Sequence, residues 1–146
     1  MELGENLSVT RFDRITDSYV ASYVHMNGKI GTLVHFSNTI DSEVAKGIAM
    51  QVAATQPLSI SSDDLPQDTL ASERQVIRQQ VLNEGKPEAI VDKIVDGKIG
   101  KYFKEVCLLE QSYVKDADQT IKSLLHIVVS YLLIKKKIVL VRSFRG

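Results

Sequence analysis

Two segments of alternating apolar and polar residues, SYVASYVHM and KIGTLVHFS, flank the dipeptide Asn27-Gly28. Alternation with a period of two is typical of a β-strand that buries one of its faces. Asn-Gly readily adopts positive φ at both central positions of a type I′ turn, which joins two antiparallel strands. The pattern therefore predicts a β-hairpin centred on this dipeptide.

Such a turn also fixes the register of the two strands. It places His25 opposite Ile30 and Tyr23 opposite Thr32, while His35 falls on the face opposite to that of His25. One face of the predicted hairpin is then formed by Tyr19, Ala21, Tyr23, His25, Ile30, Thr32, Val34 and Phe36.

The apolar period changes to about four at residue 41, which predicts a helix. Asp41 or Ser42 can serve as its N-cap, and Pro57 ends it because proline cannot continue a helix. The apolar side of this helix consists of Val44, Ile48 and Val52, with Ala45, Ala49 and Ala53 beside them.

Glycine and proline divide the middle of the chain into three further predicted helices. One begins near Pro66 and ends at Gly85, the next runs from Pro87 to Gly97, and the last covers residues 98–109. Their apolar stripes are Leu70, Ile77 and Val81; Ile90, Val91, Ile94 and Val95; and Ile99, Tyr102, Phe103 and Val106.

The two ends of the chain carry β-strand patterns. Residues 6–13 alternate weakly and predict a short strand, and the β-branched segment 137–144 predicts a second one. Residues 120–134 fit a helix or a strand equally well. Within them, the eleven residues 124–134 are almost all apolar, too few to cross a bilayer as a helix, which needs about twenty. We therefore expect a buried element there.

This order of elements predicts an α+β fold in two layers. The antiparallel sheet would contain the hairpin and a returning C-terminal strand, and several helices would cover it. The length of 146 residues suits one domain, and 44% hydrophobic with 25% charged residues is ordinary for a globular protein. The single cysteine excludes an internal disulfide and favours a reducing compartment.

The net charge of zero is distributed unevenly. Residues up to Asp118 hold all 18 acidic residues and 12 basic ones, whereas the last 28 residues hold six basic residues and no acid. The basic end could fold back and neutralise the rest, or it could contact nucleic acid or an acidic protein. No aromatic residues alternate with these lysines in the way that is typical of nucleic-acid binding, so we do not expect a nucleic-acid partner.

The stretch GKIGKYFKEVCLLEQSYVKD has no phosphate-loop spacing. Such a loop has a glycine five positions before its Gly-Lys pair, but Asp92 and Val95 occupy those positions here. No dinucleotide-binding fingerprint is present. Cys107 has no histidine beside it in the sequence, and its apolar neighbours favour a packed, unreactive thiol over a nucleophile.

The remaining polar residues do not suggest an active site either. His25, His35 and His126 lack a metal-ligand spacing, and we expect His126, in its apolar run, to be a hydrogen-bonded core residue. No pair of carboxylates lies in an apolar stretch. We therefore expect a binding protein with no catalytic residue, cofactor or metal.

Four segments together resemble bacterial elongation factor Ts. GKIGKYFKEVCLLEQSYVKD is similar to the signature of that family, and three further segments agree in order and spacing. They are SYVHMNGKIGTLVHF, AKGIAMQVAATQPLSIS and LNEGKPEAIVDKIVDGKI.

The resemblance implies a guanine nucleotide exchange factor that binds elongation factor Tu in its GDP form and promotes GDP release without covalent chemistry. In that family, the Tyr-x-His hairpin contacts the β-barrel domain of elongation factor Tu, which selects His25, Asn27, Gly28 and Lys29 as partner-binding residues. From the residues alone, Gly28 would serve only the turn and His25 would be an ordinary exposed histidine.

The resemblance further implies a homodimer or a 2:2 complex, no direct nucleotide binding, no membrane, and a cytoplasmic or bacterial-type organelle location. The sequence departs from the family in lacking its N-terminal helical domain and its Thr-Asp-Phe-Val motif. We therefore expect residues 1–16 to be an N-terminal strand and connection, and residues 17–146 to be the second half of the core domain. Exchange could then be weak, and the alternative is a docking or dimerisation module that binds without driving exchange.

Two smaller departures lie towards the C-terminus. Ser112 stands where the family usually has proline, which predicts a slightly looser turn. The ending KIVLVRSFRG resembles the end of the family only loosely.

Overall fold

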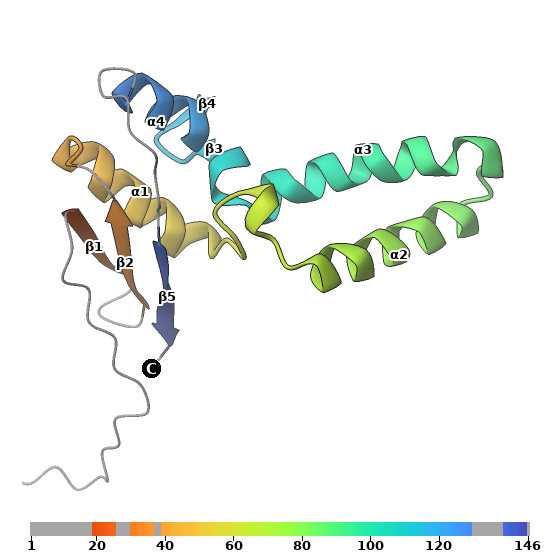
Figure 1. The fold of residues 1–146 in the computed structure, drawn as a ribbon, viewed down its shortest axis with the longest axis horizontal. Coiled ribbons are helices and arrows are strands. Elements are labelled where there is room, and N and C mark those ends of the chain that lie inside the picture. Colours follow the sequence, from red (N-terminus) through yellow and green to blue (C-terminus); the bar gives the residue numbers. More distant parts are fainter. Residues whose placement is uncertain (1–18, 26–29, 37–38, 130–138, 146) are drawn as a thin grey trace, which may run out of the picture.

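A computed structural model of the chain describes residues 19–25, 30–36, 39–129 and 139–145. Figure 1 shows a small sheet with a helix across it, and a pair of long helices that projects to one side. In chain order the elements are β1 (Tyr19–His25), β2 (Ile30–Phe36), α1 (Ser42–Thr55), η2 (Ser62–Asp64), α2 (Gln67–Asn83), α3 (Glu88–Val106), η3 (Leu108–Glu110), β3 (Ser112–Tyr113), β4 (Asp116–Thr120), α4 (Ile121–Val129) and β5 (Val139–Arg145).

The predicted hairpin register is confirmed. β1 and β2 are antiparallel, with Tyr23 opposite Thr32 and His25 opposite Ile30. β5 pairs antiparallel with the other edge of β2, which confirms the returning C-terminal strand and gives the order β1-β2-β5. The turn at 27–28, the strand predicted for 6–13 and the boundary at residue 17 lie outside the described residues.

The inner face of the hairpin packs on α1. Ala21, Thr32, Val34 and Phe36 are buried there, as the alternation predicts. Thr32 adds a buried polar link, because its hydroxyl donates to the carbonyl oxygen of Ala49 at 2.9 Å. Apolar burial and one specific hydrogen bond therefore fix the sheet against the helix.

Both predicted ends of α1 are confirmed. The Asp41 carboxylate accepts hydrogen bonds from the backbone N–H groups of Glu43 and Val44, at 2.9 and 3.1 Å, so Asp41 is the N-cap. Gln56, directly before Pro57, closes the helix in the left-handed region with φ of 45°. The cap and the proline together limit α1 to Ser42–Thr55.

The side of α1 that faces away from the sheet packs on the segment around β3. The ring of Tyr113 lies directly over Gly47, so that a Cβ atom there would be 1.9 Å from the phenol oxygen. Burial raises the pKa of the Tyr113 phenol, and the charge of Glu43 adds to the effect. Only glycine at position 47 allows this close packing.

The sequence pattern of 120–134 fitted either a helix or a strand. Of these residues, the structure describes 120–129, which begin at the end of β4 and continue as α4. Ile121 and Leu125 are one helical turn apart and are both buried against the core around α1. His126 is exposed, so the prediction that it is a core residue was wrong. One residue beyond Leu125 corresponds to about 100° around a helix, which turns His126 away from the core.

The elements around α1, namely β1, β2, β5, β3, β4 and α4, form what we call the body. The antiparallel pair α2–α3, residues 67–106, forms the arm, which projects away from the body (Figure 1). The α+β class is confirmed, with α1 rather than the arm lying against the sheet. The buried seam of the arm consists of Ile77, Val81, Val91, Val95 and Ile99, with Leu70, Ile94 and Phe103 partly buried beside it.

The predicted helix break at Gly97 was wrong, because α3 is continuous through it. Val91, Val95 and Ile99 recur every four residues on both sides of the glycine and are buried against α2. Glycine lowers helix stability by only about 1 kcal/mol relative to alanine and keeps its N–H donor. The packing of the seam offsets that cost. The predicted ends at Pro66 and Gly85 are confirmed, and Gly85 has a φ of 72°.

Candidate partner-binding surface

The end of the hairpin brings an aromatic pair to the surface. His25 is the last residue of β1 and is exposed. Its ring stacks on that of Tyr23, with the centroids 5.8 Å apart and the planes at 29°. The Tyr23 hydroxyl oxygen lies 3.1 Å from Nδ1 of His25. The alternating pattern placed the two rings on one face but did not predict their hydrogen bond.

The other three residues selected from the sequence, Asn27, Gly28 and Lys29, lie outside the described residues. His25 and Ile30 are nevertheless paired across the ladder. In the sequence, these three residues lie between the two paired strand ends.

The outer face of the hairpin carries exposed apolar residues. Val24 is 65% exposed, and Val20 is also exposed. Both alternate with the inward-facing residues of β1, so they lie on the face that α1 does not cover. Exposed apolar side chains beside a polar strand end are suited to a protein contact, because they can be desolvated by a partner.

The histidines are not brought together. His35 lies on the outer face of β2, on the other side of the sheet from His25, and His126 lies on α4. Among the residues that the structure describes, no group of three or more histidine, cysteine or acidic residues is placed to hold a metal ion. No described helix is both long enough and apolar enough to span a membrane.

Cys107 is a packed residue, as predicted. It follows α3 directly, is fully buried, and its sulfur lies 3.3 Å from the hydroxyl oxygen of Ser59. Around it, Leu58 donates to Val106 and Leu108 donates to Ser59 through backbone hydrogen bonds. The thiol is therefore enclosed where the arm joins the body.

A buried amide pair lies at the same junction and was not predicted from the sequence. The Gln51 amide nitrogen donates to the side-chain oxygen of Gln111 at 3.0 Å and to the carbonyl oxygen of Ser112 at 3.1 Å. Gln111 in turn donates to the carbonyl oxygen of Glu105, near the end of α3, at 2.7 Å. The one sign of this pair in the sequence is the presence of a glutamine, Gln51, within the apolar run of α1.

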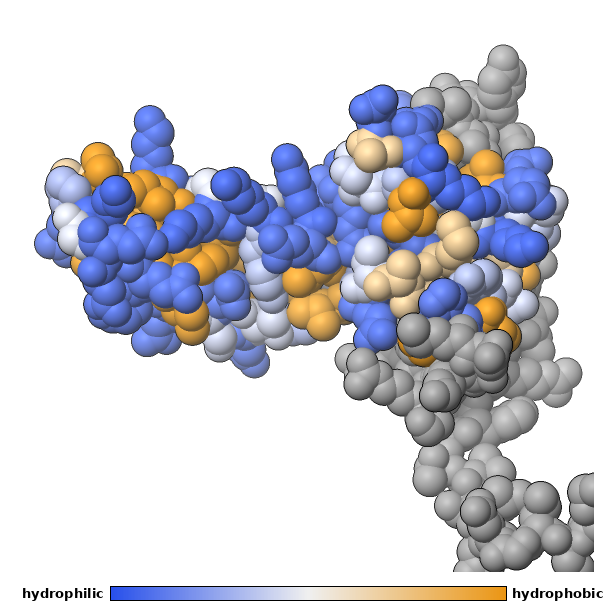
Figure 2. Space-filling model, turned by 180° about the vertical axis from the view of Figure 1, so that it is seen from behind, coloured by the Kyte–Doolittle hydropathy of each residue, from blue (hydrophilic) through white to orange (hydrophobic). Residues whose placement is uncertain are grey.

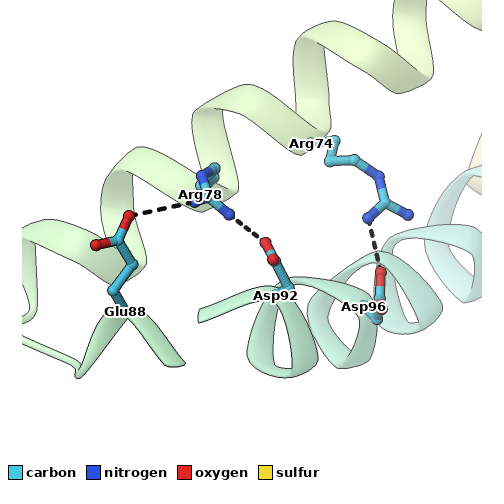
Figure 3. A network of polar contacts seen from close by, with 5 residues as sticks. All are labelled: Arg74, Arg78, Glu88, Asp92 and Asp96. Atoms are coloured by element: carbon cyan, nitrogen blue, oxygen red, sulfur yellow. Dashed lines mark hydrogen bonds and ion pairs between the residues drawn. The ribbon is translucent and has the colours of Figure 1, made fainter. Parts of the chain in front are cut away.

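The two flanks of the arm differ. On one flank, Arg74 pairs with Asp96 at 2.6 Å, and Arg78 pairs with Asp92 and Glu88 (Figure 3). These residues are exposed, so each ion pair contributes little to stability.

The opposite flank of the arm is more apolar. Val76 lies two residues from Arg74 and two residues from Arg78, so it is on the side of α2 opposite to these arginines. It is 51% exposed, and Ile90 of α3 is 44% exposed. Figure 2 shows that apolar residues gather along the arm on the face seen from behind.

Comparison with known proteins decides the family. A family model described as elongation factor TS matches residues 1–143. This chain belongs to the elongation factor Ts family. The resemblance carried by the four sequence motifs is thereby confirmed.

Similar members of the elongation factor Ts family come from clostridia. Elongation factor Ts of Clostridium perfringens (strain SM101 / Type A) is 48% identical over 130 residues, which are 85% of this chain and 43% of that protein. Elongation factor Ts of Clostridium botulinum (strain Alaska E43 / Type E3) is 50% identical over 125 residues, which are 82% of this chain and 41% of that protein. The chain thus spans about two fifths of the length of these elongation factor Ts relatives.

Proposed function

We propose that this chain acts in translation elongation as a guanine nucleotide exchange factor for elongation factor Tu. The observation that carries the proposal is the elongation factor Ts family match over residues 1–143. The geometry agrees with a role in binding, because the hairpin end exposes a histidine and apolar residues on a sheet held firmly against α1.

Exchange of this kind needs no covalent chemistry. A factor that binds the nucleotide-free form of its partner more tightly than the GDP form weakens GDP binding by the same free energy. The chain would itself hold no nucleotide, and its contribution would be differential affinity for the two states of elongation factor Tu.

The contact surface that we propose is the end of the hairpin. His25 would offer a ring nitrogen to the partner, Lys29 a charge, and Asn27 and Gly28 the shape of the turn. Val24, on the other face of the same strand end, would add exposed apolar area that a partner can desolvate. The partner surface would be the β-barrel domain of elongation factor Tu.

The extent of exchange is a separate part of the proposal. The chain corresponds to 43% of the length of its C. perfringens relative. We therefore expect the 146 residues by themselves to bind elongation factor Tu. They should accelerate the release of GDP from it less than a full-length relative does. A docking module that binds without exchange is the second candidate, and the same partial coverage favours it. The site of action would be the cytoplasm, or the matrix of a bacterial-type organelle.

A stopped-flow experiment tests both candidates. Release of a fluorescent GDP analogue from elongation factor Tu is followed with this chain and with full-length elongation factor Ts. Release that is faster than the spontaneous rate but slower than with the full-length factor supports exchange. Binding with no acceleration supports docking alone, and no binding overturns both.

A matched pair of variants tests the surface. His25→Ala should weaken binding to elongation factor Tu about tenfold, the effect of losing one central contact residue. His126→Ala removes the same side chain from an exposed position on α4 and should leave the affinity unchanged. Equal affinities for the parent and His25→Ala would show that the contact lies elsewhere.

A further inference from the structure

We infer that Tyr23 is a positioning residue that holds His25 in one tautomer, with its Nε2–H group available to the partner. The inference rests on the proposed function for its binding role. Its structural part, the tautomer of His25, can be measured without any partner.

Tyr23 is a firm support for the histidine. Its backbone lies in the hydrogen-bonded ladder opposite Thr32. The Thr32 hydroxyl lies 3.3 Å from the Tyr23 carbonyl oxygen and 2.9 Å from that of Ala49, so it joins this point of β1 to α1. The Tyr23 side chain packs, partly buried, against the core of the body. The backbone of Tyr23 is therefore fixed in the sheet, and its side chain is supported by the core.

His25 is held on that support by two contacts. The two residues are separated by one position along β1, so their side chains share a face of the strand. The rings stack, and the phenol oxygen lies 3.1 Å from Nδ1. Stacking sets the plane of the imidazole, and the hydrogen bond sets its rotation within that plane.

The hydrogen bond also determines where the imidazole proton lies. A neutral imidazole has one nitrogen that donates and one that accepts. A phenol is a better donor than acceptor, because its oxygen lone pair is partly delocalised into the ring. When Tyr23 donates to Nδ1, the ring proton must be on Nε2. Among the described residues, the hydrogen-bond partner of the His25 ring is Tyr23 at Nδ1. In this proposal, Nε2–H is the group that His25 offers to a carbonyl or carboxylate oxygen of elongation factor Tu.

Such preorganisation favours binding. An exposed histidine that alternates between tautomers and rotamers must be ordered when its partner binds, and that ordering costs affinity. A ring fixed by a neighbouring side chain avoids part of the cost. Tyr23 would thus improve affinity without contacting the partner.

The first test is long-range proton–nitrogen NMR of the histidine rings in the free chain, at a pH above the ordinary imidazole range. In the parent, Nδ1 of His25 should show the shift of an acceptor and Nε2 that of a protonated nitrogen. Tyr23→Phe, which removes only the hydroxyl, should give averaged shifts, and Tyr19→Phe on the same strand should change nothing. A proton on Nδ1 in the parent, or an unchanged Tyr23→Phe spectrum, overturns the inference.

The second test is the affinity for elongation factor Tu. Tyr23→Phe should weaken binding about threefold to tenfold, and adding it to His25→Ala should cause no further loss. If His25→Ala binds as the parent does, the proposed contact and the binding role of Tyr23 both fail. If His25→Ala weakens binding but Tyr23→Phe does not, this inference alone fails.

Discussion

The body and the arm bury their apolar residues in different ways. In the body, one helix is covered on one side by a sheet and on the other by the β3 segment, and the buried residues come from strands and helices far apart in the chain. In the arm, two neighbouring helices share a single seam, and most other positions are exposed. Because the contacts of the arm are local and few, we expect it to open at a lower free energy than the body does.

The junction couples the two regions in spite of this difference. Gln111 contacts both Gln51 of α1 and the carbonyl oxygen of Glu105 at the end of α3. Backbone hydrogen bonds, including that from Leu109 to Ile60, join the segment that leads into the arm to the segment that leads out of it. The arm is therefore held at its base by the body, and along its length it is stabilised chiefly by its own seam.

The largest effect is expected in the body, for Gly47→Ala. The new Cβ atom would lie 1.9 Å from the Tyr113 hydroxyl oxygen and 3.0 Å from its ring carbon Cζ, so either the ring or α1 must move. Overpacking of this severity should lower the free energy of unfolding by about 3 kcal/mol. Urea titration measures the loss, and a midpoint equal to that of the parent would show that Tyr113 does not lie on α1.

A smaller effect is expected in the arm, for Phe103→Ala. Phe103 is partly buried at the edge of the seam, so the loss should be about 2 kcal/mol, below the usual cost for a fully buried phenylalanine. Amide hydrogen exchange should become faster in α2 and α3 and stay unchanged in β1, β2 and α1. Equal acceleration in both regions would mean that arm and body unfold as one unit.

The smallest effect, opposite in sign, is expected for Gly97→Ala. A Cβ atom at this exposed position of α3 meets no atom within 4 Å. Alanine should therefore stabilise the arm by about 0.5–1 kcal/mol, since it loses less backbone freedom on folding. Slower amide exchange confined to the arm is the expected readout. A destabilised arm would indicate that α3 is interrupted at this glycine after all.

The sequence predicted those features that depend on local patterns. The hairpin register followed from alternation around Asn27-Gly28, and the start of α1 followed from the capping preference of Asp41. The effect of Gly97 was misjudged because glycine has a low helix propensity, which in a sequence looks like a helix end. The packing of the seam, which outweighs that propensity, is not visible in the sequence. His126 was misplaced because an apolar run does not show which side of a helix is buried.

Long-range features could not be predicted in this way. The contact of Tyr113 with Gly47 and the pairing of Gln51 with Gln111 both join segments about 60 residues apart. The candidate site was predicted only in part. The family resemblance selected His25, whereas its bond to Tyr23 depends on side-chain rotamers that no pattern of residue types specifies.

Hydrogen exchange of the chain, free and bound to elongation factor Tu, tests most directly whether the body provides the contact. Binding should slow exchange most in β1, β2 and residues 26–29 between them. Protection along α2 and α3 should be smaller and should not appear alone. Slower exchange confined to the arm, with β1 and β2 unchanged, would show that the arm and not the body provides the contact.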